Sequence, residues 1–132
     1  MIALDANILI RFITRDNPKQ AAKAERILRT AKENFFVGLP VLLELVWLLD
    51  RRFGFSRSEI AEVLRAFYER KDFVFENEDH VMAAVAAFED GADFGDHLIF
   101  EGARASGCSK LITFDTDFVN KHSDFVILPK RA

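Results

Sequence analysis

The chain has 132 residues, of which 50% are hydrophobic and 14 are Phe, so we expect a packed core rather than a disordered or fibrous chain. A single Cys excludes an internal disulfide framework and suits a reducing compartment. Lys and Arg number 18 against 21 Asp and Glu, and the formal charge of −3 at face value disfavours a general nucleic-acid coat protein.

Short apolar runs alternate with helical patterns along the chain. We expect strands at 2–4, 35–37, 73–75, 111–114 and 125–128. Helical spacing predicts helices over 18–34, 41–53, from the capping-box sequence at 56–59 through 67, over 77–90, and from about 95 to 107. Asn7 is a further candidate helix cap. This alternation predicts an α/β fold, with a parallel sheet covered by helices on both faces.

The expected organisation and location are simple. We find no internal repeat, linker or low-complexity tract, so residues 1–132 are expected to form a single domain. No stretch has the length and apolar character that a membrane span needs. The first residues lack the basic region of a secretory signal. We therefore expect a cytoplasmic protein without membrane association.

Acidic residues gather where strands end and helices begin. Asp5 follows the first strand, and Asp115 follows the fourth. Asp93 and Asp96 are spaced i, i+3 at a helix entrance, so both can lie on one side of its first turn. Glu44 stands in a helix with apolar neighbours on nearly every side. In parallel sheets, ligands bind beyond the carboxyl ends of the strands, which is where these acids are expected.

Because its helix is so apolar, we expect Glu44 to be buried, and a buried carboxylate is seldom found unless it is paired or bound to a cation. Several converging carboxylates repel one another unless a metal neutralises them. Oxygen ligands without a Cys or His cluster select Mg²⁺ or Mn²⁺. Such an ion lowers the pKa of a bound water, which can then attack a phosphodiester. The pattern therefore favours metal-dependent phosphoryl transfer or hydrolysis.

Structural roles can explain many of the same residues. Asp5, Asp93 and Asp115 can each be a helix cap, and for Asp117 we prefer that role to catalysis. We expect Trp47 in the core and His97 at the surface or behind the site. The cations that follow the first acid form either a solvated face or a contact to RNA phosphates; they are Arg11, Arg15, Lys19 and Lys23.

The ordered motifs resemble those of PIN-domain ribonucleases, and in particular the toxins of VapBC-type toxin–antitoxin pairs. The motifs are Asp5-Ala6-Asn7-Ile8-Leu9, Leu43-Glu44-Leu45-Val46-Trp47, Asp93-Phe94-Gly95-Asp96 and Thr113-Phe114-Asp115. The resemblance covers essentially the whole chain. It implies a three-layer α/β/α domain with a central parallel sheet of about five short strands.

The resemblance also implies a Mg²⁺-dependent endoribonuclease, with Mn²⁺ as a possible substitute. Its acidic quartet corresponds to Asp5, Glu44, Asp96 and Asp115, with Asp93 nearby. The resemblance implies that Asp5 and Asp96 are the primary metal ligands, while Glu44 and Asp115 bind a second ion or hold metal-bound waters. Asn7 would orient Asp5 or a metal-bound water, and Thr113 matches the family's hydroxyl position. The implied partners are an RNA substrate, a cognate VapB-type antitoxin and a second copy in a homodimer.

This chain departs from the family's pattern at two places. Ala6 stands where Thr is common, and Phe100-Glu101 replaces a pair of small residues, which would alter packing near the site. Asp115 and Asp117 compete for the position of the fourth acid. Setting six acids of the predicted site and its surroundings aside from the 21 acidic residues leaves 15 against 18 basic residues, so the net negative charge does not exclude RNA. The six are Asp5, Glu44, Asp93, Asp96, Asp115 and Asp117.

Two alternative functions remain. A receiver-like phosphoacceptor domain has a similar length and sheet, but it needs paired acids after the first strand, where Ala6 follows Asp5. A catalytically silent PIN module that binds RNA or protein is the second alternative, and the intact acidic residues argue against it.

Overall fold

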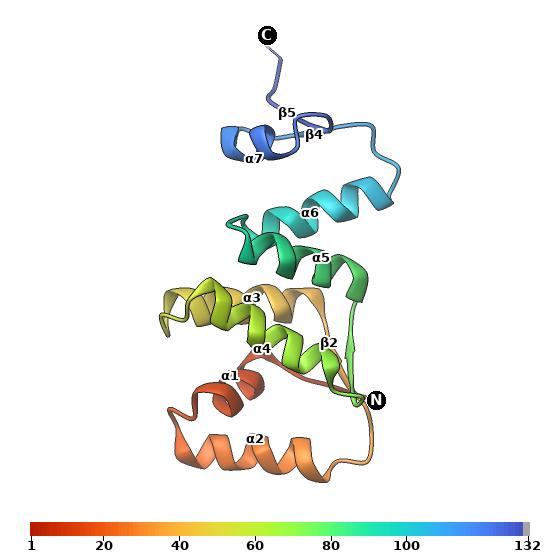
Figure 1. Ribbon diagram of the computed structural model, residues 1–132. Coiled ribbons are helices and arrows are strands. Elements are labelled where there is room, and N and C mark those ends of the chain that lie inside the picture. Colours follow the sequence, from red (N-terminus) through yellow and green to blue (C-terminus); the bar gives the residue numbers. More distant parts are fainter. Residues whose placement is uncertain (131–132) are drawn as a thin grey trace.

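A computed structural model describes residues 1–130, and its elements follow one another as an α/β chain (Figure 1). The strands are β1 (Ile2–Ala3), β2 (Phe35–Val37), β3 (Phe73–Phe75), β4 (Leu111–Ile112) and β5 (Val126–Ile127). The helices are α1 (Ala6–Thr14), α2 (Pro18–Thr30), α3 (Leu39–Arg51), α4 (Arg57–Glu69), α5 (Glu78–Glu89), α6 (Phe94–Ala105) and α7 (Thr116–Lys121). The α/β class and the five short strands are confirmed.

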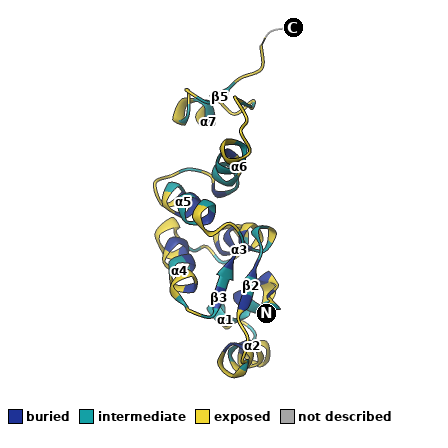
Figure 2. Cartoon of the chain, turned by 90° about the vertical axis from the view of Figure 1, so that its right-hand side faces the viewer, coloured by how far each residue is buried: buried dark blue, intermediate teal, exposed yellow. Residues whose placement is uncertain are grey.

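The first three strands form a parallel sheet in the order β1-β2-β3. Phe35 pairs with Phe73 across β2 and β3, and the two rings meet edge to face with centroids 5.8 Å apart. Both strands bury their first and third residues, while the middle residue is half-buried. Helices α1, α3, α4 and α5 supply most of the remaining core around this sheet (Figure 2).

The helix starts show which cap predictions hold. Ser56 and Glu59 form the predicted capping box of α4, in which each side chain accepts a hydrogen bond from the other residue's backbone N–H. Asn77 precedes α5 as expected. The prediction that Asn7 is a cap is wrong, because Asp5 is the N-cap of α1 and Asn7 lies inside the helix.

The last two strands form a second parallel sheet of their own, β4-β5. Phe118 of α7 and Val126 of β5 are buried together with Phe100 of α6, in a small cluster separate from the main core. Helices α5 and α6 lie between this unit and the β1-β2-β3 sheet (Figure 1). The five strands are therefore divided between two sheets, because the C-terminal unit packs on Phe100 rather than against β1.

Several apolar side chains remain exposed on this architecture. Ile112 of β4 is 64% exposed and Phe114, which follows the strand, is 88% exposed. Trp47 on α3 is 60% exposed, so the prediction that it lies in the core is wrong. Across residues 1–130, no helix is both long and apolar enough to cross a membrane.

Candidate functional site: an acidic cleft at the starts of α6 and α7

Two carboxylates stand at the start of α6. Asp93 is the N-cap, and its Oδ1 accepts a hydrogen bond from the backbone N–H of Asp96 at 2.8 Å. This bond satisfies one of the free N–H groups that every helix start presents. The i, i+3 spacing brings both carboxylates to the same cleft, as expected from the sequence. Asp93 therefore combines a structural role with a place in the candidate site.

A third carboxylate comes from the start of α7. Asp115 is the N-cap, and its Oδ1 accepts from the backbone N–H groups of Asp117 at 3.0 Å and Phe118 at 3.2 Å. The hydroxyl of Thr113 accepts from the backbone N–H of Asp115 at 3.1 Å, which fixes the turn between β4 and α7. The preference for Asp117 as the cap is wrong, since that residue lies in the first turn.

The two helix starts border one cleft of about 190 Å³. The acidic residues at its wall are Asp93, Asp96, Asp115 and Asp117, and the basic ones include Arg57 and Lys121. Burial raises the pKa of Asp96, and the negative charges of Asp93 and Asp115 raise it further, against a smaller opposing effect of Lys121. Two segments about 20 residues apart thus create one site of concentrated negative charge.

Basic side chains tie the wall of the cleft together. Arg57 Nη1 donates to the carbonyl oxygens of Phe88 and Ala92, both at 2.7 Å, and Lys121 Nζ donates to the carbonyl of Gly91 at 3.2 Å. These bonds anchor the loop between α5 and α6, which leads into Asp93. The cations of the cleft therefore satisfy carbonyl groups, and none forms an ion pair with its carboxylates within residues 1–130.

His97 borders this cleft and is largely buried, so of the two predicted positions, at the surface or behind the site, the structure favours the second. Its side chain is 11% exposed, and its Nε2 lies 3.0 Å from Glu101 Oε1, one helical turn further along. In the part of the chain that the structure describes, its Nδ1 is buried without a hydrogen-bond partner. His122 stacks on Phe100 with centroids 4.0 Å apart, and burial lowers the pKa of His122. The i, i+4 spacing of His97 and Glu101 was the feature of the sequence that could have predicted their contact.

Glu44 occupies a neighbouring cleft of about 390 Å³, whose wall also includes Asp93 and Gly95. The expectation that Glu44 is buried is wrong, because its side chain is exposed. The helix buries its other face, at spacings of three and four residues, through Leu42, Leu45, Val46 and Leu49. Glu44 therefore lies on the exposed face of α3, together with Leu43 and Trp47. A side chain at Gly95 would approach both Leu43 Cδ2 and Asp93 Oδ1 to 3.3 Å.

Asp5 and Asn7 stand at the start of α1, where Asp5 is the N-cap and Asn7 lies in the first turn. Asp5 Oδ1 accepts from the backbone N–H of Ala6 at 2.7 Å, and both Asp5 and Asn7 are exposed. Neither residue is part of the wall of the acidic cleft. The predicted quartet is thus divided: Asp96 and Asp115 line the acidic cleft, Glu44 lines the neighbouring cleft together with Asp93, and Asp5 lines neither.

The donor chemistry of the acidic cleft fits a hard divalent cation, because its ligating atoms are carboxylate oxygens. Burial raises the pKa of Asp96, and the repulsion from Asp93 and Asp115, which a cation would relieve, raises it further. The arrangement is more open than a preformed metal centre. Over residues 1–130, no three His, Cys, Asp or Glu side chains are grouped closely enough to hold one ion. The metal-ligand set remains a prediction.

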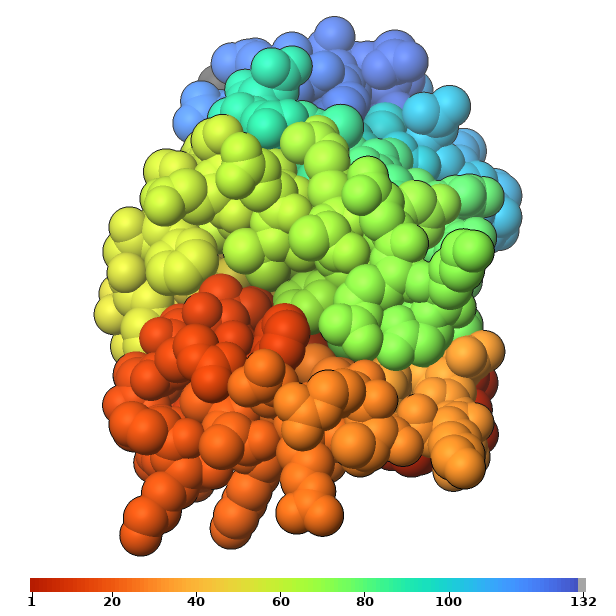
Figure 3. All heavy atoms as spheres, turned by 60° about the horizontal axis from the view of Figure 1, so that its bottom comes forward, coloured from red at the N-terminus to blue at the C-terminus, as the bar shows by residue number. Residues whose placement is uncertain are grey.

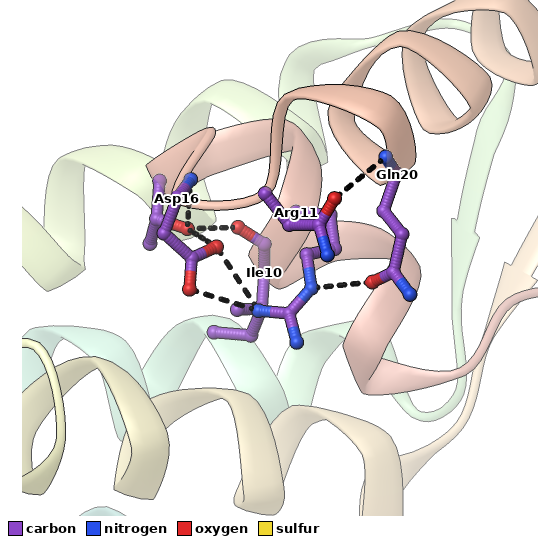
Figure 4. A network of polar contacts seen from close by, with 6 residues as sticks. Ile10, Arg11, Asp16 and Gln20 are labelled. Carbon is purple, nitrogen blue, oxygen red and sulfur yellow. Dashed lines mark hydrogen bonds and ion pairs between the residues drawn. The ribbon is translucent and has the colours of Figure 1, made fainter.

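The basic residues after Asp5 divide into two kinds. Arg11 donates through Nη1 to both oxygens of Asp16, at 3.0 and 3.1 Å, and through Nε to Gln20 Oε1 at 2.6 Å (Figure 4). Arg15 pairs with Glu25 at 3.1 Å. Within residues 1–130, neither Lys19 nor Lys23 has a carboxylate partner. All four positions are at least partly exposed, as both a solvated face and a contact to RNA phosphates require, but only the two lysines are uncompensated.

Comparison with protein-family models matches residues 2–122 to the PIN domain. Among solved structures, the chain is similar to the crystal structure of Mycobacterium tuberculosis VapC20, described as a sarcin-ricin loop cleaving toxin. The two are 19% identical, the match covers 92% of this chain and 95% of that one, and the TM-score is 0.48. A comparison with curated proteins finds no match. The family match spans nearly all of the chain and decides against the receiver-like alternative, so this chain belongs to the PIN-domain family.

Proposed function

We propose that this PIN-domain protein is a divalent-metal-dependent endoribonuclease and the toxin of a VapBC-type toxin–antitoxin pair. The observation that carries the proposal is the convergence of Asp93, Asp96 and Asp115 in one cleft, where burial and the charges of Asp93 and Asp115 raise the pKa of Asp96. Family membership supports nuclease chemistry at such a cluster of acids. The ordered VapC-like motifs of the sequence support the assignment to the toxin subgroup.

The proposed ion is Mg²⁺ or Mn²⁺, and the proposed ligands that line the acidic cleft are Asp96 and Asp115. Asp5 and Glu44 lie outside this lining and are proposed to bind a second ion or to hold metal-bound waters. When bound, the ion supplies a water of lowered pKa for attack on a phosphodiester bond. The carboxylates of the acidic cleft would also keep other anions out unless they are neutralised. Selective entry of RNA therefore depends on the cation that these side chains hold.

The remaining residues of the site are proposed to position these acids. Thr113 holds the backbone N–H of Asp115, so its hydroxyl fixes the direction in which that side chain leaves the turn. Asp93 holds the backbone of Asp96 in the same way. Asn7 lies two residues beyond Asp5, and its amide is proposed to orient Asp5 or a water.

The direct test compares Asp96→Asn with Asp79→Asn, because both residues are acids in the first turn of a helix and only Asp96 is in the acidic cleft. With Mg²⁺ and single-stranded RNA, we expect cleavage by the parent and by Asp79→Asn, and its loss in Asp96→Asn. Thermal unfolding checks that the variants fold. RNA cleavage by Asp96→Asn at the parental rate would contradict the mechanism, and an inactive parent would favour the catalytically silent alternative.

A second comparison tests Glu44 separately. Glu44→Gln is matched by Glu62→Gln, since both are exposed helical glutamates and neither forms an ion pair within residues 1–130. We expect Glu44→Gln to reduce the RNA cleavage rate at fixed Mg²⁺ and the reduction to be partly reversed at higher Mg²⁺. Equal rates for the two variants at all Mg²⁺ concentrations would remove Glu44 from the ligand set.

The proposed partner is a small VapB-type antitoxin, and a homodimer is proposed for the free toxin. Leu43 and Trp47, 40% and 60% exposed, flank Glu44 and leave apolar surface beside the candidate site. A protein that covers these side chains would also block access to Glu44. Co-purification with the product of a neighbouring short reading frame, with loss of RNA cleavage in the complex, would support the antitoxin.

A further inference from the structure

Three basic side chains form an uncompensated stripe along α2. Lys19, Lys23 and Arg26 are exposed and stand at positions i, i+4 and i+7, so they lie on one side of the helix. Within residues 1–130, no carboxylate lies within 4 Å of their charged groups. Figure 3 shows long side chains of this red-orange to orange segment projecting freely from the molecule.

The charges nearest to the stripe do not neutralise it. Glu25 is the only acidic residue of α2, and it pairs with Arg15. Asp16 is paired with Arg11. The hydrogen bond from the Thr14 hydroxyl and the charge of the Arg11 guanidinium hold the pKa of the Asp16 carboxyl below its usual value. The protein carries a net charge of −3, but this face is positive because its acids already have partners.

A groove of about 430 Å³ between α1 and α2 adjoins the stripe. Its apolar lining comes from Ile8, Ala24 and Ile27, the last of which is 38% exposed. Polar groups at the edge come from Asn7, Gln20 and Lys23. Gln20 Oε1 accepts a hydrogen bond from Arg11, so the side-chain amide nitrogen of Gln20 is left as a donor for a ligand. The groove thus joins an apolar surface, amide groups and a cation within one small volume.

We propose that this groove and stripe bind single-stranded RNA outside the acidic cleft, with phosphates on Lys19, Lys23 and Arg26 and an unstacked base against Ile27. The proposal rests on the proposed ribonuclease function and extends it to a substrate-binding surface. A row of cations matches the regular charges of a nucleic-acid backbone. An apolar groove beside such a row takes a base only when that base is free of a duplex, so single-stranded RNA is the expected ligand.

The test measures RNA affinity without cleavage. A fluorescein-labelled single-stranded RNA of mixed sequence is titrated with protein in a chelator-containing buffer, and anisotropy gives Kd over a series of KCl concentrations. The triple variant Lys19→Gln, Lys23→Gln, Arg26→Gln removes the stripe. The control triple variant Arg52→Gln, Lys71→Gln, Lys130→Gln removes the same charge at exposed positions outside it.

We expect the stripe variant to bind more weakly, and its slope of log affinity against log salt to fall by about 2, since each single-strand phosphate contact contributes about 0.7. The control variant should keep the parental slope. Ile27→Gln should weaken binding while leaving the slope unchanged, because it alters the groove and no charge. Equal slopes for the stripe variant and the parent would overturn the proposal. The proposal would also be overturned if the stripe variant lost the binding of polyglutamate that the parent shows but kept the parent's affinity for RNA.

Cleavage measured separately with Mg²⁺ distinguishes the two proposals. Cleavage by the parent, with no loss of slope in the stripe variant, would overturn the binding surface and leave the ribonuclease function intact. A parent that does not cleave RNA, with a slope that falls in the stripe variant, would support the surface and overturn the function. All three positions are exposed, so thermal unfolding should show a folded triple variant.

Discussion

At the scale of single residues, the Arg70–Asp72 pair shows how one charged contact stabilises a turn. Arg70 donates through Nε and Nη2 to the two oxygens of Asp72, at 3.0 and 2.9 Å, in the turn between α4 and β3. The guanidinium also lies over the Phe73 ring, 4.9 Å from its centroid. The hydrogen bonds and charge of Arg70 lower the pKa of Asp72 below 3.8.

This shift gives a pH-dependent stability. Because the folded pKa of Asp72 is lowered, its contribution is fully present above pH 3.8 and is lost as the pH falls through the folded value. We expect Asp72→Asn to lower the free energy of unfolding at neutral pH by less than about 1 kcal/mol, because both side chains are partly solvated. Urea unfolding of parent and variant should show the gap closing at acid pH. A gap that is unchanged well below pH 3.8 would contradict this account.

At the scale of elements, α6 joins the candidate site to the C-terminal unit. Its first turn carries Asp93 and Asp96, and Phe100 in its second half anchors Phe118 and Val126. The resemblance drew attention to Phe100 as a bulky residue where the family has a small one. In this chain that ring is the contact on which α7 and the β4-β5 sheet rest. The position of Asp115 therefore depends on packing one turn beyond Asp96 and two turns beyond Asp93.

Truncation of this anchor should loosen only part of the molecule. Phe100→Ala removes a buried ring, a change that costs about 3–5 kcal/mol in a well-packed core. We expect faster hydrogen exchange in β4, α7 and β5, because their cluster is separate from the main one, and unchanged protection in β2 and β3. Ile99→Ala is the control, since Ile99 is 58% exposed. Uniform loss of protection in both clusters would show that they unfold as one unit.

The elements also show what the sequence could predict. Phe35–Val37 and Phe73–Phe75 match the expected strands residue for residue, because each is a short apolar run with clear boundaries. The capping box of α4 was equally predictable from the sequence. The sequence could not predict that β4 and β5 form a separate sheet, since strands that pair over only two residues are too short to show a periodic pattern of apolar residues. Which face of α3 is buried was also hidden, because apolar residues surround Glu44 in the sequence.

The candidate site was predictable to a similar degree. The spacing of Asp93 and Asp96 was enough to place them in one cleft, because a helix turn fixes their relation. The meeting of Asp115 with that pair required tertiary packing, and the choice between Asp115 and Asp117 as cap depended on where α7 begins. The sequence left two positions open for His97, because its burial comes from Phe100 and His122, and His122 is remote in sequence.

At the scale of the whole molecule, negative charge is concentrated near α6 and α7 while α2 is positive. Carboxylates that repel one another in the folded protein destabilise it, and a bound cation relieves that repulsion. Any ligand that binds only the folded state raises stability by about 2.7 kcal/mol when present at 100 times its Kd. The proposed metal site should therefore be visible in unfolding experiments without any substrate.

We expect Mn²⁺ or Mg²⁺ to raise the Tm of the parent by several degrees in a thermal unfolding assay. The same additions should raise the Tm of Asp79→Asn equally and that of Asp96→Asn much less, because only Asp96 is in the acidic cleft. KCl at matched ionic strength controls for general screening. A parental metal response in Asp96→Asn would place the ion elsewhere.

The isolated β4-β5 sheet has a further consequence for the protein in solution. Its strand β4 has an open edge, next to which Ile112 and Phe114 face the solvent. Because β4 has only two residues, its edge offers little backbone for pairing with another chain. Its exposed apolar side chains nevertheless favour association between like chains. Colloidal solubility, rather than folding stability, should then limit how far the protein can be concentrated.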